Sequence, residues 1–504
     1  MRSPASAACC AIHLPTLLVG ERTGGGNTPA GVRFATDGRR LGRRARAHGP
    51  GGGRRGPGTR RLASKARGTL SFLGLKAAFV RADLRAMAPA RILLAVSQLA
   101  PCGVSDLILH LVGALDRERF EPSVLALHAD DAPVSSLEAE AAGAARFARL
   151  GIPARSMVLR ARGSLRQRIA PLVKLLREET FHVVHAHSRP ADLWLTLAGV
   201  VARTPVRLYT RQATYGAWPL SLRLRYALLA RCATRVVAVS DAVHTHLRSR
   251  ELVPRRRVEL VPDGIALAPL EHTRPRRETR ADLGIDPEAP LVTTVALLTP
   301  RKGHRFLVSA ARAVLDRHPR TRFLFVGDGP ERTALEAVVR ASPRPEAFLF
   351  VGERMDYADC IAASDLYVLP SLWEGLNLSL LTACALGVPV VASNVGSNPE
   401  IITHGVSGLL PTPSVATLAA ESLDPHALAD AIAGLLADRE RARALARAAR
   451  AHVRARFSAE LMAARHETLY ARLLEERGVD LQRLEGLKAF AGPMAQDAGG
   501  GILL

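Results

Sequence analysis

Short apolar runs recur along the chain from residue 91 onward and set its main pattern. The runs show little alternation of apolar and polar positions, as in RILLAVS at 91–97, which is typical of strands covered on both faces. Longer stretches with helical spacing, Asp106–Asp116 and Leu165–Glu179 among them, lie between the runs. This order predicts β-α-β units around a parallel sheet. The remaining runs of the first series lie at 122–128, 182–188, 206–210 and 235–240.

The pattern stops at a Pro- and charge-rich stretch, Val261–Asp286, and then starts again. Strands of the second series are predicted at 291–298, 322–329, 347–352, 365–371 and 388–394. We therefore expect an α/β protein with two Rossmann-like, doubly wound parallel-sheet domains that face each other across a cleft. Ligands bind beyond the carboxyl ends of such strands, so the residues just after each strand are the candidates for a site.

The same pattern sets the expected domain boundaries. We expect an N-terminal domain at 87–265 and a C-terminal domain at 266–455. Helical spacing over Glu460–Glu476 predicts a C-terminal helix within 456–476, for which packing back on the N-terminal domain is one option. Residues 477–504, with their Gly-rich end, are expected to form a loosely ordered tail.

Residues 1–86 differ in composition from the rest of the chain. They are rich in Gly, Arg, Ala and Pro and carry 17 Lys and Arg against 3 Asp and Glu, so they supply +14 of the formal net charge of +23. Such a segment buries too little apolar surface to order itself. Three interpretations stay open: an extension upstream of a true start at Met87, which we favour; an Arg-rich transit peptide; or a basic arm for nucleic acid or anionic lipid. The lack of interleaved aromatic residues disfavours nucleic acid as a partner.

Cysteine usage and hydropathy bear on location. The six cysteines are scattered without metal-ligand spacing, in a chain of 504 residues that does not need disulfide bonds to fold, which indicates a reducing compartment. No apolar run approaches the ~18 uninterrupted residues of a membrane-spanning helix, and the start lacks the compact apolar region of a secretory signal. We expect a cytoplasmic protein, and peripheral contact with the inner face of the membrane stays open.

The most informative segment is Leu369–Glu400, which reads LPSLWEGLNLSLLTACALGVPVVASNVGSNPE. A predicted strand is followed by a loop with Glu374 and by a helix that ends at Gly387. The first N–H groups of this helix are free to hold a phosphate, and an acid beside them suits the hydroxyls of a sugar attached to that phosphate. The residues that carry these N–H groups are Gly375, Leu376, Asn377 and Leu378. Taken alone, a capping role for Glu374 is the simpler explanation.

This segment resembles the donor-site signature of glycosyltransferase family 4, a family of retaining enzymes with the two-domain GT-B fold. In that signature a Glu-Gly pair opens the helix, and a second Glu follows seven residues after the first. The similarity extends from about Arg91 to about Arg472. Further matching pieces are Val239-Ser240-Asp241, VPDGI at the linker start, Thr299–Gly303, VGDGPE at 326–331, Gly396–Glu400 and the closing helix with Phe457 and Tyr470. Each piece is a weak signal, whereas their order and spacing together are specific.

The resemblance implies roles for the matching residues of the C-terminal domain. Glu374 would hold hydroxyls of the donor sugar, and the backbone of Gly375–Leu378 would donate to its phosphate or sugar. Lys302 would neutralise the diphosphate, and Arg301 would add a forked contact. The plain alternative for Lys302 and Arg301 is a pair of solvated charges on a loop.

In the N-terminal domain the resemblance implies that His187, at the end of the run HVVHAHS, lies next to the transferred sugar. His185 and His182 share its strand parity, so at least one of the three is expected to be structural. The loop after the first strand matches the family's glycine turn, where the backbone at Gly103 approaches the donor phosphate or the acceptor. Cys102 stands where the family has a second glycine.

Two positions depart from the family pattern. The second acid of the signature falls on Thr382, and the loss of its charge-assisted contact to the ribose is expected to cost about 1–3 kcal/mol of donor binding. The Gly-Arg pair before the loop that ends in Lys-Gly is Ala296-Leu297 here. Arg301 is the candidate substitute for the missing guanidinium.

By this resemblance the chain is expected to be a retaining glycosyltransferase with a nucleotide diphosphate sugar as co-substrate, no further cofactor and no metal. The sequence agrees on the metal, because no Asp-x-Asp cluster follows a strand. The expected acceptor is a glycan, a lipid-linked molecule or a cell-envelope component. The segment Trp218–Arg235 mixes arginines with Leu, Trp and Tyr, which fits an interfacial helix on a membrane or an ordinary amphipathic helix equally well.

Two other functions stay open at this point. A catalytically impaired protein that binds a sugar nucleotide or glycan on the same fold is the main alternative, and Thr382 and Leu297 motivate it. A sugar-nucleotide epimerase on the same architecture is the third, although no dedicated pair of acids stands out for it.

Overall fold

The structure is a computed structural model that describes residues 89–129, 136–159, 164–214, 219–411 and 423–479. The predicted extension at 1–86, the favoured start at Met87, the tail from residue 480 onward and Trp218 lie outside the described residues. Among the residues that are described, no helix combines the length and apolar character needed to cross a membrane.

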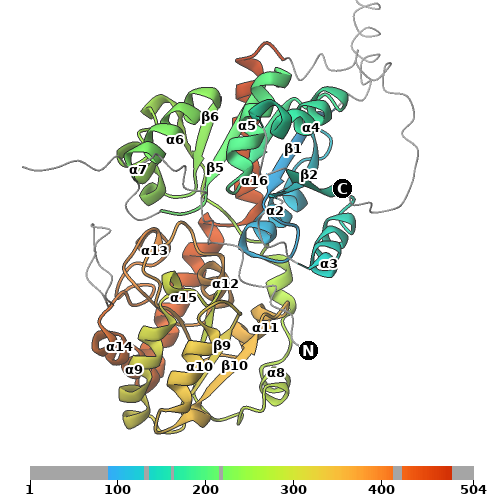
Figure 1. Cartoon of the computed structure of the whole chain (residues 1–504). Coiled ribbons are helices and arrows are strands. Elements are labelled where there is room, and N and C mark those ends of the chain that lie inside the picture. Colours follow the sequence, from blue (N-terminus) through green and yellow to red (C-terminus); the bar gives the residue numbers. More distant parts are fainter. Residues whose placement is uncertain (1–88, 130–135, 160–163, 215–218, 412–422, 480–504) are drawn as a thin grey trace, which may run out of the picture. The chain divides into compact units, whose positions relative to one another are not determined.

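The N-terminal domain is built around a parallel sheet of seven strands (Figure 1). Their spatial order is β3-β2-β1-β4-β5-β6-β7. The strands are Ala90–Val96 (β1), Phe120–Ala129 (β2), Ala154–Leu159 (β3), Val183–Ala186 (β4), Val206–Arg211 (β5), Arg235–Ala238 (β6) and Val258–Leu260 (β7). Alternate residues of β1 belong to two separate hydrophobic clusters, Leu93 and Ala95 to one and Ile92 and Leu94 to the other. Both faces of the sheet are therefore covered, as the apolar runs without alternation predicted.

The C-terminal domain repeats this arrangement around a parallel sheet of five strands, in the order β10-β9-β8-β11-β12. The strands are Leu291–Val295 (β8), Arg322–Val326 (β9), Phe348–Gly352 (β10), Leu366–Leu369 (β11) and Val390–Ala392 (β12). In each sheet the first strand along the chain lies next to the fourth, as in a Rossmann-like sheet. The switch points are therefore between β1 and β4 and between β8 and β11. The prediction of two doubly wound parallel sheets is confirmed.

Strands β3 and β7 are absent from the predicted set. Both lie at an edge of the seven-stranded sheet, and most of their residues are half-exposed. An edge strand is covered less completely than a central one, so its sequence has no continuous apolar run. The pattern that found the central strands could not find these two.

Helices connect the strands in both domains. Those of the N-terminal domain are Gly103–Ala114 (α2), Leu137–Ala148 (α3), Leu165–Glu178 (α4), Ala191–Ala202 (α5), Leu220–Cys232 (α6) and Asp241–Ser249 (α7). Those that follow are Arg276–Asp282 (α8), His304–Arg317 (α9), Arg332–Arg340 (α10), Tyr357–Ala362 (α11), Leu378–Leu386 (α12), Asn398–Ile401 (α13), Pro425–Ala437 (α14), Arg439–Arg456 (α15) and Ala459–Glu475 (α16). Single 3₁₀ turns lie at Arg255–Arg257, Ala268–His272, Pro300–Lys302 and Pro345–Ala347.

The last two helices pack on different domains. Helix α15 packs against α12 of the C-terminal domain, whereas α16 packs against α2 and β5 of the N-terminal domain, where it appears in red among blue and green elements in Figure 1. The return crossing runs beside the linker, because the N–H of Ile265 donates to the carbonyl of Phe457 and the N–H of Ala459 to that of Ile265. Gly264 has no room for a side chain here, since a Cβ would lie 2.2 Å from the carbonyl oxygen of Ser458.

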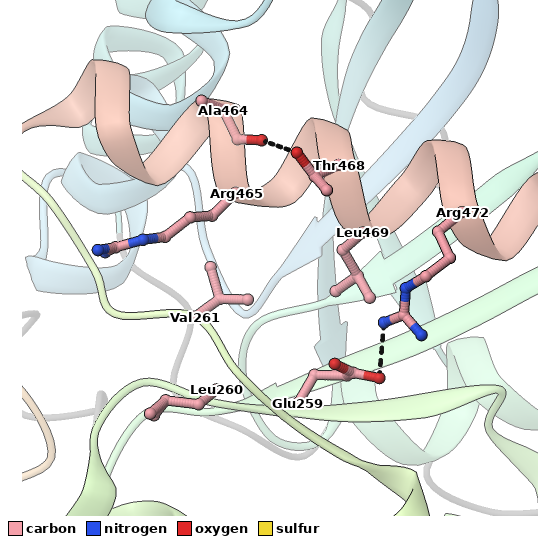
Figure 2. A pocket seen from close by; sticks show the side chains of 8 residues that line it. All are labelled: Glu259, Leu260, Val261, Ala464, Arg465, Thr468, Leu469 and Arg472. Carbon is pink, nitrogen blue, oxygen red and sulfur yellow. Dashed lines mark hydrogen bonds and ion pairs between the residues drawn. The ribbon is translucent and has the colours of Figure 1, made fainter.

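Helix α16 also contacts the edge strand β7. Arg472 Nη2 lies 2.8 Å from Glu259 Oε1 across this contact. Figure 2 draws this ion pair as a dashed line. A pocket of about 320 Å³ lies between the two elements. None of the predicted site residues is among the eight side chains that line it.

Candidate functional site

Glu374 lies in the loop between β11 and α12 and is buried, with 3% of its surface exposed. Its Oε1 lies 2.6 Å from Lys302 Nζ and accepts hydrogen bonds from Ser371 Oγ at 2.6 Å and Asn377 Nδ2 at 3.1 Å. Its Oε2 lies 3.4 Å from Arg301 Nη1. The structure therefore brings Glu374 together with two other predicted site residues, Lys302 and Arg301, which lie 72 and 73 positions before it in the sequence.

The charges around this carboxyl group fix its protonation state. Burial by itself raises the pKa of Glu374, but the charges of Lys302 and Arg301 and the hydrogen bonds from Lys302 and Ser371 outweigh burial, so the pKa lies below its usual value. Burial and the neighbouring Lys302 lower the pKa of His304 to about 3. At neutral pH the site holds an ionised Glu374 and a neutral His304.

The sheet topology explains why Lys302 and Glu374 meet. Lys302 follows β8 and Glu374 follows β11, and these two strands are neighbours at the switch point of the C-terminal sheet. The two loops are joined by a hydrogen bond from the N–H of Leu372 to the carbonyl of Arg301, 2.8 Å long. Gly303 has a φ of 65°, and a Cβ there would lie 2.0 Å from the carbonyl oxygen of Pro370. Glycine is therefore required at this position for the loops to touch.

Helix α12 begins at Leu378, three residues later than predicted. Asn377 is its N-cap and accepts the N–H of Leu380 on Oδ1 at 2.9 Å. Gly375 instead forms an isolated antiparallel bridge with Ala213 of the N-terminal domain. The prediction that the helix opens at Gly375 is wrong because Asn377 is the better cap and because a long-range contact holds Gly375 in an extended segment.

Thr382 faces the interior of the fold. The side chain is buried, its Oγ1 donates to the carbonyl of Leu378 at 2.9 Å, and it also hydrogen-bonds the hydroxyl of Tyr357. The expectation that Thr382 faces a ribose receives no support from this arrangement. Leu297, the second departure from the family pattern, is half-buried, and Arg301 supplies a guanidinium at the site.

The three histidines around β4 differ in their surroundings. His182 accepts the N–H of Arg91 on Nδ1, and His185 is bound to Tyr470 and Thr210 through its two ring nitrogens. His187 follows the end of β4 and is buried, and among the described residues neither of its ring nitrogens has a hydrogen-bond partner. Burial, with a smaller effect of the nearby His466, lowers the pKa of His187 well below its usual value. Among the described residues, His187 is thus the one of the three with both ring nitrogens buried and without a hydrogen-bond partner.

Gly103 opens helix α2 after β1. Cys102 caps the helix and, together with Ser105, forms a reciprocal capping box. Gly103 is exposed, and a Cβ there would meet no atom within 4 Å. The backbone at Gly103 is therefore open to a ligand, although no protein contact requires glycine at this position.

Two residues at the site, Ser371 and Thr214, were missed from the sequence. Ser371 stands three residues before Glu374, and a hydroxyl at that spacing was a usable signal. The hydroxyl of Thr214 donates to the backbone carbonyl of Glu374 at 3.1 Å from the other domain, and nothing local to either residue indicates this contact. Among the described residues, no group of three or more His, Cys, Asp or Glu side chains is placed to hold a metal ion.

Two family models match the chain. Residues 101–268 match the model described as Glycosyltransferase Family 4, and residues 275–452 match the model described as Glycosyl transferases group 1. Together the matches span most of both domains, including Lys302 and Glu374.

Among curated relatives, an Escherichia coli UDP-Gal:alpha-D-GlcNAc-diphosphoundecaprenol alpha-1,3-galactosyltransferase is 27% identical over 47% of this chain and 64% of its own length. A Corynebacterium glutamicum GDP-mannose-dependent monoacylated alpha-(1-6)-phosphatidylinositol monomannoside mannosyltransferase is 30% identical over 41% of this chain and 54% of its own. The chain spans about half to two thirds of the length of the curated relatives it matches.

Solved structures share the fold. The crystal structure of Anabaena HepE in complex with UDP and glucose superposes with a TM-score of 0.62 at 24% identity, over 75% of this chain and 99% of that one. The sucrose-phosphate synthase of Thermosynechococcus elongatus superposes with a TM-score of 0.58 at 23% identity, over 77% and 100%. With two matching family models, two parallel-sheet domains and these neighbours, the chain belongs to glycosyltransferase family 4 and has the GT-B fold.

Proposed function

We propose that this protein is a retaining glycosyltransferase that moves a sugar from a nucleotide diphosphate sugar onto a glycan, lipid-linked or cell-envelope acceptor. The observation that carries the proposal is the convergence of Glu374, Lys302 and Arg301 beyond the two strands at a switch point. A buried site with two cations and one carboxylate matches a ligand that has both a diphosphate and sugar hydroxyls.

The ion pair between Lys302 and Glu374 is the resting state of this site. A diphosphate carries more negative charge than one carboxylate, so the donor competes for Lys302 and Arg301 and releases Glu374 to accept sugar hydroxyls. Because Glu374 holds Lys302 in place beforehand, the cation needs little rearrangement when charge develops on the leaving group. Such pre-organised charge is often the largest catalytic contribution.

The N-terminal domain supplies the other side of the site in this proposal. A donor hydroxyl beside His187 would give its unpartnered ring nitrogens the hydrogen bonds they lack, and the open space at Gly103 suits the acceptor or the donor phosphate. In the transfer, the bond from the anomeric carbon to the acceptor oxygen forms on the face from which the diphosphate leaves. The acceptor proton passes to an oxygen of the departing phosphate.

The named ligands of relatives support these classes of donor and acceptor. The two bacterial relatives are named for UDP-Gal with a diphosphoundecaprenol acceptor and for GDP-mannose with a phosphatidylinositol mannoside. Crystals of HepE were obtained with UDP-glucose. We accordingly place a nucleotide diphosphate sugar in the site around Glu374 and infer an acceptor of the lipid-linked or cell-envelope class.

A screen of the full chain for hydrolysis and transfer of common nucleotide sugars tests the proposal. Glu374→Gln and Lys302→Ala are each expected to lower kcat by about 10²–10³-fold. Asp365→Asn is the matched control, since this acid of the same domain pairs with Arg280 at 2.8 Å away from the proposed chemistry. Turnover that survives both site changes contradicts the assignment. Donor binding without turnover by the unaltered chain would identify a sugar-nucleotide-binding protein instead.

Helix α6 supports peripheral membrane contact through the segment 218–235. Its buried residues are Tyr226, Ala227, Leu229 and Ala230, so the apolar face toward the core is already complete. A second apolar stripe faces outward, with Leu220, Leu224 and Leu228 exposed at 61%, 50% and 63%. An ordinary amphipathic helix has polar residues on this face, and a contiguous exposed apolar stripe is typical of an interaction surface.

Arginines gather at the C-terminal end of the same helix. The guanidinium groups of Arg207, Arg235 and Arg257 donate to the carbonyls of Cys232, Thr234 and Ala233. Burial lowers the pKa of Arg257. The charges of four neighbouring arginines lower it further: Arg256, Arg235, Arg477 and Arg231. An exposed leucine stripe on a helix that has arginines around its C-terminal end is the combination expected of a helix that contacts an anionic lipid surface.

Vesicle flotation tests this contact. The full chain is expected to float with vesicles that contain phosphatidylglycerol and not with pure phosphatidylcholine. Leu224→Gln with Leu228→Gln is expected to reduce flotation about tenfold or more, because each leucine loses its transfer into the apolar layer. Leu137→Gln with Leu165→Gln is the control, since these leucines on α3 and α4 are exposed at 67% and 52%. An equal loss of flotation in both double variants, or no loss of flotation in either, rejects α6 as the membrane contact.

A further inference from the structure

The backbone of the acid loop is held by a segment of the other domain. Directly after β5, the Thr214 hydroxyl donates to the carbonyl of Glu374, and Ala213 bridges Gly375 in antiparallel fashion. The segment Gln212–Thr214 thus contacts both residues of the Glu-Gly pair. These contacts join positions 160 residues apart in the chain.

The contact is close enough to restrict both partners. A Cβ at Gly375 would lie 1.8 Å from the carbonyl oxygen of Gln212. On the other side, a Cβ at Gly396, which has a φ of 53°, would lie 2.2 Å from the carbonyl oxygen of Glu374. The backbone of Glu374 is therefore packed between Gly396 of its own domain and Gln212–Thr214 of the N-terminal domain. Movement of Gln212–Thr214 would change the position of the carboxylate.

A buried ionic network fixes the start of this segment. Arg211, the last residue of β5, is buried, and its Nη2 and Nη1 lie 2.7 Å from Glu251 Oε2 and 3.3 Å from Asp192 Oδ2. Its guanidinium also lies over the ring of Tyr226, 4.6 Å from the centroid, and the Tyr226 hydroxyl hydrogen-bonds Asp192. The Arg211 side chain is thus held from three elements, α5, α6 and the turn after α7, at the residue before Gln212.

The two domains meet at a second point on the same side of the C-terminal sheet. Both carboxylate oxygens of Glu400, on α13, accept backbone hydrogen bonds at the start of α7, from the N–H groups of Asp241 and Ala242 at 3.0 Å each. This carboxylate caps a helix of the other domain. The contact at Gln212–Thr214 is therefore supported by an independent tie between the domains.

We infer that Thr214 and Arg211 are positioning residues for the donor site, through which the N-terminal domain sets the position of the Glu374 carboxylate. Loss of the Thr214 contact would release the loop that must hold the sugar. Gly375 is the partner that makes the close approach possible. This inference rests on the proposed function for the role of Glu374, whereas the contact itself does not.

A purely structural role is the competing explanation, since buried ion networks are common where they only join elements. Stability does not distinguish the two explanations for Arg211, because removing this side chain leaves Asp192 and Glu251 buried without their shared cation. Thr214 distinguishes them. It is half-buried, its change to Val keeps the shape of the side chain, and the hydroxyl is all that is lost.

The test compares Thr214→Val with Thr214→Ser in the full chain. Loss of one hydrogen bond to the loop is expected to raise the donor KM about three- to tenfold with a smaller change in kcat and an unchanged Tm, and Ser is expected to restore the donor KM. Thr468→Val is the control, since its hydroxyl donates to the carbonyl of Ala464 on an exposed part of α16. Equal donor KM values in the Val variant and the unaltered protein overturn the inference.

Hydrogen exchange of the protein without donor separates this inference from the proposed function. Amides of residues 371–378 are expected to exchange several-fold faster in Thr214→Val, and faster again in Gly375→Ala, where the added methyl group prevents the approach of Gln212. Gly434→Ala is the control, because a Cβ there meets no atom within 4 Å. Unchanged exchange in both variants overturns the positioning role, whatever donor the protein uses. Faster exchange in a protein that turns over no nucleotide sugar would leave the positioning role standing and reject the proposed function alone.

Discussion

Lys302 Nζ lies 2.6 Å from Glu374 Oε1, and both side chains are more than nine-tenths buried. In a poorly solvated site, each of two opposite charges is stabilised mainly by the other. If one is removed, the remaining charge has lost its hydration without gaining a counter-charge. Arg301, at 3.4 Å and more exposed, compensates part of the charge on Glu374. The pair therefore affects stability as well as the proposed chemistry.

Removing the Lys302 cation is expected to destabilise the fold. Lys302→Met keeps the length of the side chain but leaves Glu374 with Arg301 as its nearest cation, and we expect a loss of about 3 kcal/mol in the free energy of unfolding. The double variant with Glu374→Gln is expected to recover most of that loss, since no buried charge then remains unpaired. Urea unfolding of the two single variants and the double variant measures the coupling. Additive effects of the two changes would show that the pair is not coupled.

Restoring the family's second acid with Thr382→Glu is expected to lower stability without improving donor binding. The position is buried, and its hydroxyl hydrogen-bonds the Leu378 carbonyl and Tyr357, so a carboxylate there would be desolvated inside the fold. We expect a lower Tm and an unchanged donor Kd, measured by calorimetry. A tighter donor Kd would mean that this position faces the ribose after all.

Gly103→Ala is expected to separate ligand binding from stability. The added methyl group meets no protein atom within 4 Å, and Ala is a better helix former than Gly, so the Tm is expected to stay the same or rise slightly. If the donor phosphate or the acceptor approaches this backbone, the KM of that substrate rises several-fold. Kinetics with both substrates identify which one is affected. Unchanged KM values for both would remove Gly103 from the site.

Acidification is expected to destabilise the protein partly through His466. Burial lowers the pKa of this α16 residue to about 4, below the value of about 6.5 for an exposed imidazole. The unfolded chain therefore takes up a proton in the window from about 6.5 down to about 4 that the folded chain does not, and stability falls as the pH falls through it. Over this window His466 alone contributes about 3 kcal/mol. His185 and His187, whose pKa values burial lowers in the same way, add to the fall.

The measurement is the free energy of unfolding of the unaltered chain and of His466→Gln between pH 7 and pH 5. The variant lacks the titrating group, so its stability is expected to fall less steeply with acidification. Parallel slopes for the two proteins would show that His466 is not buried in its neutral form.

The amino-acid sequence by itself determined the two parallel sheets and the positions of their central strands along the chain. Strands buried on both faces have continuous apolar runs, and these runs marked β1, β4, β8 and β11, among others. It also determined that Lys302 and Glu374 lie where strands end, because both positions are defined by local patterns. The edge strands β3 and β7 have no such run and were missed.

Tertiary structure decided which of these residues act together. The start of α12 at Leu378 depends on a contact between Gly375 and Ala213, and the hold on Glu374 depends on Thr214, 160 residues away. The surroundings of His187 depend on His466, which α16 carries back to the N-terminal domain. Local sequence patterns indicate which positions of a helix or strand are apolar, but these contacts are made between segments far apart in the chain. They exist only when the two sheets and the returning helix are packed.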